Sequence, residues 1–254
     1  NYLVQIPSFR RDCTREIDIV EELIRGYGYD QIPETICSVS MNQEHFNTHM
    51  PLDNQVKNLL LGMGYHEAYN FSFMNQESVK KFNLFSQDKI LTIKNPLNKE
   101  FDVLRTGLFA SLSQNFILNQ DRGHFDVFLF EIGKTFWMEN PTHKTITEKK
   151  KLGILASGLL KPKNWATSLQ KVDFYNVKGV VEDLFLALKK GENLEFQRGE
   201  IAFLHPGKTA LIFNNKKPIG FIGEIHPDIL IEYQTKESIV YAEIDFEALQ
   251  ETKS

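Results

Sequence analysis

Apolar residues recur at helical spacing in some segments of the chain and alternate with polar residues in others. Apolar side chains three or four residues apart predict amphipathic helices, whereas a period of two predicts half-buried strands. The helical spacing predicts a first helix that ends near Gly26 and Gly28, where glycine commonly terminates a helix. The predicted helices cover residues 14–27, 53–65, 79–82, 107–119, 173–190 and 228–233.

The alternating segments predict strands that are joined mainly by hairpins. One hairpin is expected around Asn214-Asn215, since Asn tolerates positive φ, and Gly133 is expected to bend its strand. Helices mixed with hairpin-connected strands predict an α+β fold, a largely antiparallel sheet flanked by helices. A Rossmann fold is disfavoured because no GxGxxG follows a strand. The predicted strands and hairpin cover residues 2–4, 67–74, 90–93, 125–137, 152–160, 209–227 and 239–246.

The chain divides by composition into three parts. Residues 1–33 form one unit, residues 34–52 are a polar, Pro-bounded linker, and residues 53–254 form a larger unit. Asp12 and Thr14 are placed to cap the first helix. The chain starts in a strand-like segment without an initiator Met, so we expect a piece of a longer protein.

Composition and charge narrow the classes of function. Hydrophobic residues make up 42% and charged residues 24% of the 254, as in ordinary globular proteins, and no apolar stretch reaches the ~20 residues of a membrane span. A net charge of −4 excludes binding of nucleic acid by bulk charge alone. Scattered lysines, among them Lys216-Lys217, are interpreted as a solvated face, with the alternative of local contacts to RNA phosphates. Cys13 and Cys37 form no CxxC, so no zinc ribbon or disulfide framework is indicated.

The first helix carries the most distinctive cluster of charged residues. Asp18, Glu21 and Glu22 lie at i, i+3 and i+4, so their carboxylates are expected on one patch, and Asp12 precedes the helix closely enough to join them. Oxygen donors of this kind suit Mg²⁺ or Ca²⁺. A solvated acidic helix face without a bound metal would show the same spacing. The opposite arc of the helix is apolar and holds Ile17, Val20, Leu23, Ile24 and Tyr27.

Several long blocks, in order, resemble one protein family. The chain is similar to the β subunits of bacterial phenylalanine–tRNA ligases over almost its whole length. The blocks are IPSFRRDCTREIDIVEELIRGYGYDQIP, NPLNKEFDVLRTGLFASL, LFEIGKTF, DFYNVKGVVEDL, LHPGKTALIF and IGFIGEIHPDIL.

The resemblance implies a fold, partners and a metal site. It implies that residues 1–33 end a small winged-helix-like module and that residues 53–254 form a class II synthetase-like core. It implies an α2β2 heterotetramer in the cytoplasm that charges tRNA(Phe) with phenylalanine, using ATP that this region does not itself bind. Within the family pattern, Asp12, Asp18, Glu21 and Glu22 match ligands of a Mg²⁺ site shared with the α subunit.

The core is expected to be catalytically inactive. Active class II cores neutralise phosphates with arginines on a strand–loop–strand and on a later glycine-rich element. Here the strand VFLFEIGKTFWM supplies Glu131 without an arginine before it, and the stretch IGFIGEIHP has none. Arg105 and Arg122 remain, and both are interpreted as surface or capping residues.

Two other classes of function stay open. The chain is alternatively a free-standing tRNA- or nucleotide-binding module with a synthetase-like core. It is otherwise a small-molecule enzyme in which Glu131 works with His205 or His226 as acid and base. Both histidines precede Pro, so a structural role in turns is the simpler interpretation.

Overall fold

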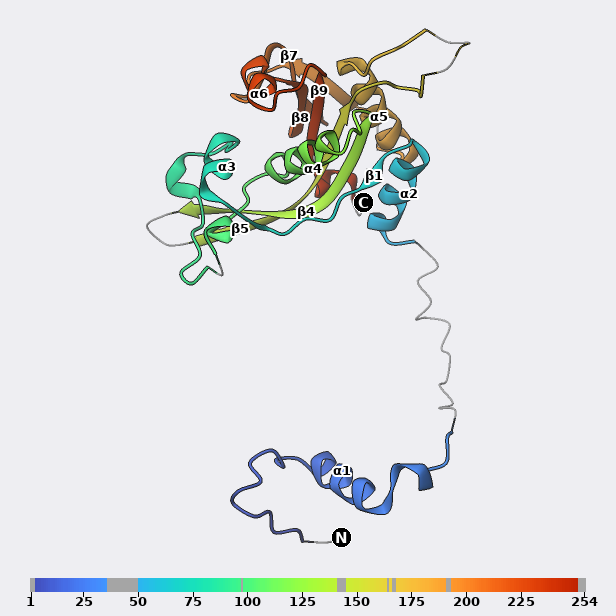
Figure 1. Cartoon of the computed structure of the whole chain (residues 1–254), viewed down its shortest axis with the longest axis vertical. Helices are drawn as coiled ribbons and strands as arrows, with labels where there is room; N and C mark the ends of the chain where they lie inside the picture. The colour runs from blue at the N-terminus through green and yellow to red at the C-terminus, as the bar shows by residue number, and fades with distance from the viewer. Residues whose placement is uncertain are drawn as a thin grey trace. The chain divides into compact units, whose positions relative to one another are not determined.

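The computed structural model describes residues 3–35, 50–96, 98–140, 145–163, 165, 168–190 and 193–250. These residues belong to two compact units, residues 1–48 and residues 49–254, both drawn in Figure 1. Residues 36–49 of the predicted linker, with Cys37, lie outside the described part.

In residues 3–35, the described part of the N-terminal unit, the α-helix α1 (Glu16–Tyr27) is followed by the 3-10 turn η1 (Tyr29–Gln31). The helix ends as predicted at Gly28, whose φ of 103° favours a residue without Cβ. The predicted caps are wrong: Asp18 reaches back and accepts from the backbone N–H groups of Thr14 and Arg15. The predicted strand is also wrong for Leu3 and Val4, which pair with no strand in the described unit.

The C-terminal unit is built on a seven-stranded sheet in the order β1-β4-β5-β9-β8-β7-β6 (Figure 1). Every pairing is antiparallel except the short parallel contact of β1 with β4. This confirms the predicted α+β architecture. The strands are β1 (His66–Glu67), β4 (Val127–Asn140), β5 (Thr145–Ser157), β6 (Leu194–Arg198), β7 (Leu204–Asn214), β8 (Lys217–Ile225) and β9 (Ile239–Asp245). A separate pair joins β2 (Phe73–Met74) to β3 (Val103–Leu104).

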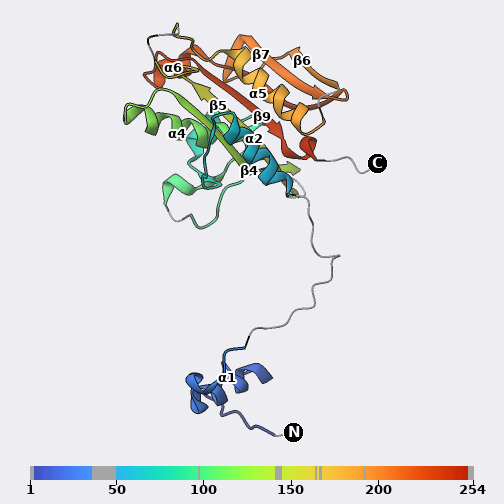
Figure 2. The ribbon, with the colours of Figure 1, turned by 90° about the vertical axis from the view of Figure 1, so that its right-hand side faces the viewer.

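Helices cover both faces of the sheet (Figure 2). Because side chains alternate along a strand, Leu152 and Ile154 of β5 join a core with α2 (Leu52–Gly62) and α5 (Phe174–Ala187). Leu155 belongs to the opposite core. That second core is covered by α3 (Gln76–Lys81), α4 (Phe109–Asp121) and α6 (Pro227–Glu232), and the carboxylates described below lie on its side of the sheet.

Several predicted strands differ from the observed ones. The strand through Gly133 continues to Asn140, beyond its predicted end at Trp137. Residues 90–93 form only an isolated bridge at Thr92, and residues 67–74 split into β1 and β2 around an unpaired stretch. The hairpin turn falls at Asn215 and Lys216, one residue later than predicted, and both have positive φ.

Within the described residues, no helix is both long and apolar enough to span a bilayer.

Candidate functional site

Two buried carboxylates lie in register across the centre of the sheet. Glu131 of β4 and Glu243 of β9 both pair with Gly153 of β5, and each is 2% exposed. A Cβ on Gly153 would lie 2.9 Å from Leu112 Cδ1, so the first turn of α4 packs directly onto this strand. The two acids therefore flank the beginning of α4, where the helix dipole favours negative charge.

Glu131 is fully engaged by neighbouring polar groups. Arg105 Nη1 donates to its Oε1 at 2.5 Å, while Asn70 Nδ2 and Ser111 Oγ donate to its Oε2 at 2.8 and 3.2 Å. Arg105 also donates to the carbonyl of Lys134 at 2.9 Å. Arg105 is 2% exposed, which corrects the prediction of a surface or capping role.

Glu243 is held in a second buried network. It accepts from Lys151 Nζ at 2.7 Å, from the Tyr241 hydroxyl at 2.5 Å and from the backbone N–H of Leu108 at 2.8 Å. Burial alone would raise the pKa of Glu243, but the Lys151 charge and these hydrogen bonds hold that pKa below its ordinary value. Burial and the neighbouring Glu243 carboxylate raise the pKa of Tyr241, so its hydroxyl stays a donor.

The space beside Glu243 is filled by side chains. A cavity of about 10 Å³ remains there, bordered by Gly107, Phe109 and Phe203. A volume of this size admits about one water molecule, not a substrate. Phe109 stacks on Phe203 with ring centroids 5.0 Å apart, and Tyr241 lies 4.9 Å from Phe109.

The groups proposed for acid–base chemistry are not brought together. No histidine in the described part of the chain is among the groups that bind Glu131. His205 lies inside β7 rather than in the predicted turn, and its Nδ1 accepts from Gly207 N. His226 caps α6, as a turn residue would, and accepts from Asp228 N at 3.3 Å.

The other arginines of this unit lie away from the two acids. Arg122 is the exposed C-cap residue of α4, as predicted. Arg198, which the sequence reasoning overlooked, ends the edge strand β6 and is exposed.

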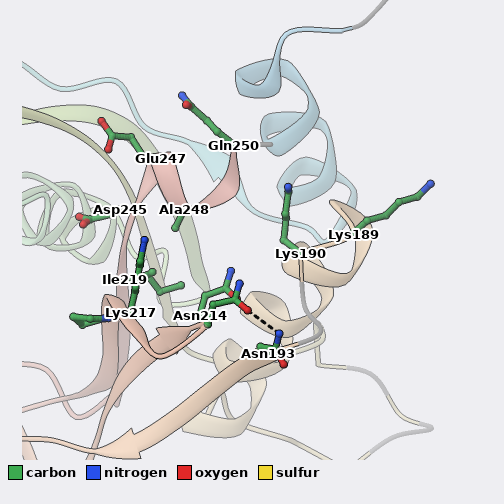
Figure 3. A pocket seen from close by; sticks show the side chains of 12 residues that line it. Lys189, Lys190, Asn193, Asn214, Lys217, Ile219, Asp245, Glu247, Ala248 and Gln250 are labelled. Atoms are coloured by element: carbon green, nitrogen blue, oxygen red, sulfur yellow. Dashed lines mark hydrogen bonds between the residues drawn. The ribbon is translucent and has the colours of Figure 1, made fainter. Parts of the chain in front are cut away.

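An open cavity of about 520 Å³ lies where the end of α5, the β7–β8 turn and the 3-10 turn η6 (Phe246–Leu249) approach one another (Figure 3). Asn193 donates to Asn215 Oδ1 at 2.7 Å across it. We call it the lysine cavity after the three cations in its lining, Lys189, Lys190 and Lys217.

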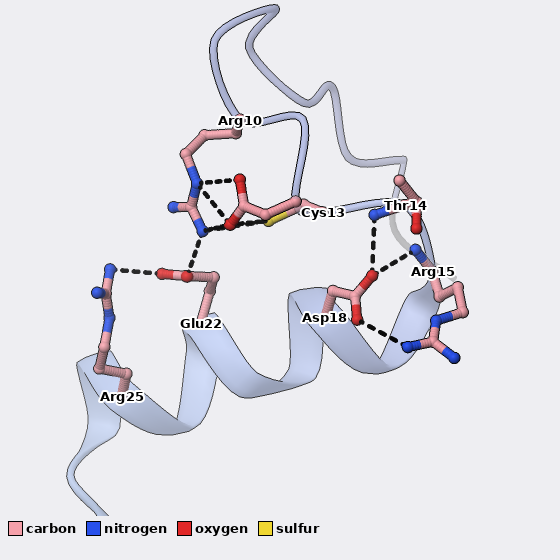
Figure 4. A network of polar contacts seen from close by, with 8 residues as sticks. Arg10, Cys13, Thr14, Arg15, Asp18, Glu22 and Arg25 are labelled. Atoms are coloured by element: carbon pink, nitrogen blue, oxygen red, sulfur yellow. Dashed lines mark hydrogen bonds and ion pairs between the residues drawn. The ribbon is translucent and has the colours of Figure 1, made fainter. Parts of the chain in front are cut away.

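The N-terminal unit brings together two of the four predicted metal ligands. Arg10 binds Asp12 Oδ2 at 2.7 Å and Glu22 Oε1 at 2.5 Å, so its guanidinium bridges the two carboxylates (Figure 4). Arg10 lowers the pKa of Asp12 to about 2 and holds the pKa of Glu22 below its ordinary value. Cys13 Sγ lies in the same cluster, whose ligand atoms all fall within 4.8 Å of one another.

The remaining two predicted ligands lie apart from this cluster. Asp18 turns to the start of α1, where it accepts from backbone N–H groups and lies 3.8 Å from Arg15 Nη2 (Figure 4). Glu21 is exposed. Arg10 therefore supplies the positive charge that Asp12 and Glu22 share in this structure.

Comparison with known proteins identifies the family. Residues 32–246 match the sequence profile described as phenylalanyl tRNA synthetase beta chain CLM domain, and residues 1–29 match the tRNA synthetase B5 domain. The chain belongs to the phenylalanine–tRNA ligase β-subunit family. It is 37% identical over 98% of its length to the β subunit of Syntrophus aciditrophicus, and 36% identical over its full length to that of Thermotoga maritima.

The match with this family is partial in one respect. The chain covers 31% of each of these two relatives, about a third of their length. A pyrrolysyl-tRNA synthetase from Desulfitobacterium hafniense has a similar fold, with a TM-score of 0.60 and 13% identity over 97% of this chain and 81% of that one. These findings confirm the family resemblance and the class II synthetase fold that the sequence predicted.

Proposed function

We propose that this chain is a non-catalytic, structural part of a phenylalanine–tRNA ligase β subunit. Its role is assembly with the α subunit in an α2β2 heterotetramer that charges tRNA(Phe) with phenylalanine at the expense of ATP. Two features support this proposal. The buried acids hold the fold together, and one segment of the core carries an apolar surface suited to a protein partner.

The observation that carries the proposal is a row of exposed aromatic rings. Tyr69, Phe71 and Phe73 are 95%, 72% and 45% exposed, although each is a large apolar side chain. They alternate with inward residues, since Ala68 and Met74 are buried. We call these three rings the aromatic row.

The aromatic row is held by the buried network behind it. Asn70, between the first two rings, donates to Glu131, and the carbonyl of Ser72 accepts from Arg105 N at 3.0 Å. Phe71 also meets Phe101 edge to face, with centroids 5.8 Å apart. The segment that carries the rings and the Phe71 ring itself are therefore held before a partner arrives, which reduces the entropy lost on binding.

The area of the aromatic row suits a stable interface. A buried aromatic side chain contributes about 150–250 Å², so the exposed parts of the three rings amount to roughly 400 Å². This is about half of the ~800 Å² that each partner buries in a standard interface. Membership of the β-subunit family supports the ligase α subunit as the partner that covers the aromatic row.

Binding of the α subunit by this chain tests the proposal. Replacing both Tyr69 and Phe71 by Ser is expected to weaken binding at least tenfold in sedimentation-velocity titrations. The matched control replaces Tyr175 and Leu186, which are 74% and 71% exposed on α5, and is expected to change binding less than twofold. Equal effects of the two double variants, or undiminished binding by the first, would refute the aromatic row as the docking surface.

We further propose that Asp12, Asp18, Glu21 and Glu22 hold Mg²⁺ together with groups of the α subunit. All four offer carboxylate oxygens, the donors that Mg²⁺ prefers, and the ion would neutralise their mutual repulsion. The donor chemistry fits, and binding requires that Arg10 release the two carboxylates it now bridges.

Manganese(II) electron paramagnetic resonance tests this proposal in the assembled complex. Bound Mn²⁺ should be lost when Asp12 and Glu22 are both replaced by the amides, with the assembly unchanged. Undiminished Mn²⁺ binding would exclude these ligands.

We propose a cytoplasmic location, because the relatives are tRNA ligases and tRNA charging serves protein synthesis there.

A further inference from the structure

The lysine cavity concentrates positive charge in a chain that is acidic overall. Lys189 and Lys190 follow α5, whereas Lys217 begins β8. Among the described residues, none of the three lies within 4 Å of a carboxylate, unlike Lys150, Lys151 or Lys178. Lys190 and Lys217 place two ammonium groups without acidic partners at one opening, which forms a site for an anion, and the Lys189 side chain extends outward from its rim (Figure 3).

The carboxylates at the cavity do not cancel this charge. Asp245 and Glu247 also line it. Asp245 already lies 3.6 Å from Lys149 Nζ, which is not a lining residue. Glu247 is exposed at the rim, and its carboxylate can accept from a hydroxyl group of a ligand.

Backbone strain is concentrated at the border of the cavity. Lys189 has a φ of 57° directly after the C-cap of α5, and Lys216 has a φ of 62° in the β7–β8 turn. Glycine is the usual residue at both kinds of position, and a bulky side chain there is strained by roughly 1 kcal/mol or more. Of these two residues, Lys189 lines the cavity, whereas Lys216 does not.

Amide groups add neutral hydrogen-bonding capacity between the lysines. Asn193 Nδ2 donates to Asn215 Oδ1, and Asn215 Nδ2 donates to Asn214 Oδ1 at 3.3 Å (Figure 3). In this chain of contacts Asn214 only accepts, so its NH2 group is available to a ligand oxygen. Amides of this kind suit ribose hydroxyls and base edges.

We propose that the lysine cavity binds one phosphate-bearing nucleotide unit of an RNA strand. Lys190 and Lys217 would contact the phosphate of this unit and Lys189 a neighbouring phosphate of the strand, while the amides and Glu247 would meet ribose or base. A volume of about 520 Å³ exceeds what a bare phosphate fills and lies within the ~300–1,000 Å³ of ligand pockets. The inference rests on the proposed function in one respect, since tRNA is the RNA that such a ligase handles.

Fluorescence anisotropy with the 254-residue chain and a labelled 12-nucleotide single-stranded RNA tests the site. Replacing Lys189, Lys190 and Lys217 by Gln is expected to weaken binding at least tenfold at 50 mM salt. It should also reduce the slope of log affinity against log salt by about 2, because each phosphate contact on a single strand contributes about 0.7.

The matched control removes the same charge elsewhere, at the exposed lysines Lys80, Lys94 and Lys236, and should change affinity less than twofold. Equal weakening by the two triple variants would overturn the site, because bulk charge would then explain binding. Absence of RNA binding by the unaltered chain at concentrations up to 1 mM would also overturn it.

Competition with uridine monophosphate distinguishes the two sources of phosphate. Displacement of the RNA shows that a single nucleotide fills the cavity, whereas RNA binding without displacement assigns it to the backbone of a strand.

The cavity variant should bind the α subunit normally. Loss of RNA binding alone therefore reports on the lysine cavity, and loss of α binding reports on the aromatic row.

Discussion

The ion pair between Arg105 and Glu131 offers a strong test of the structural role assigned to the buried acids. Both side chains are 3% exposed, and Glu131 also accepts from Asn70 and Ser111. In Glu131→Gln, the shape of the side chain is kept but the Arg105 charge stays buried without its counterion. Removing one partner of a buried pair in this way typically destabilises a protein by about 3–5 kcal/mol.

The expected loss is large enough to be measured directly. In a domain of this size, each kcal/mol lowers the melting temperature by roughly 2–4 °C, so Glu131→Gln should melt roughly 6–20 °C below the unaltered chain. The assay is thermal and urea unfolding followed by circular dichroism. The exposed pair Lys171–Glu237 provides the control, and Glu237→Gln should change stability by less than about 1 kcal/mol.

A double variant separates the ion pair from general packing. Replacing Arg105 by Met together with Glu131 by Leu removes both charges, and it should recover most of the stability lost in the single variant. A Glu131→Gln protein as stable as the Glu237→Gln control, or more stable than the unaltered chain, would refute the reasoning. Stabilisation on replacement is what a carboxylate kept for catalysis would show.

Three other predictions concern single positions. A Cβ on Gly133 would lie 2.2 Å from Arg105 Nη2, so Gly133→Ala should lower the free energy of unfolding by about 1–3 kcal/mol in urea titrations. Gly179 has no atom within 4 Å of the position of a Cβ, so the control Gly179→Ala should not be destabilising. Equal effects of the two substitutions would contradict this prediction. The pKa of Glu243 is lowered on folding, so its contribution is present above about pH 4.5 and is lost as the pH falls through the folded-state pKa. Urea unfolding of Glu243→Gln should therefore approach that of the unaltered chain in acid, and a constant difference would be inconsistent with the shift. Arg10→Ala should increase the Mn²⁺ affinity of the isolated chain in calorimetry, because Asp12 and Glu22 lose the guanidinium that bridges them and Glu22 keeps only its pair with Arg25. An unchanged affinity would show that Arg10 does not compete with the metal.

The fold was predictable where periodicity reflects burial. The nearly continuous apolar run of β9, which is buried on both sides, and the helical spacing of α5 correspond to positions that face a core. Polar or long strands were harder to predict. The first half of β5 is rich in lysine, and β6 is a short edge strand, so neither shows a strong apolar alternation. The sequence also does not reveal that Arg105 lies against Gly133, where a Cβ would be 2.2 Å from Arg105 Nη2.

The candidate sites were predictable only in part. Helical spacing put Asp18 and Glu22 on one patch, but the backbone N–H groups at the start of α1 hold Asp18. Glu243 gave no recognisable signal, since its partners Lys151 and Leu108 come from distant segments. The aromatic row did carry a signal: its rings alternate with polar residues, as in a strand with one apolar face. Sequence alone did not tell that this face points to solvent.

Phenylalanine-dependent exchange of pyrophosphate into ATP measures adenylation, the step that a structural subunit does not perform. The unaltered 254-residue chain, the α subunit and the complex of α with full-length β should be compared under one set of conditions. The account predicts exchange by the complex and none by the chain alone. Exchange sustained by the isolated chain would contradict the account. The networks around Glu131 and Glu243 would then have a catalytic role instead of the structural role assigned to them.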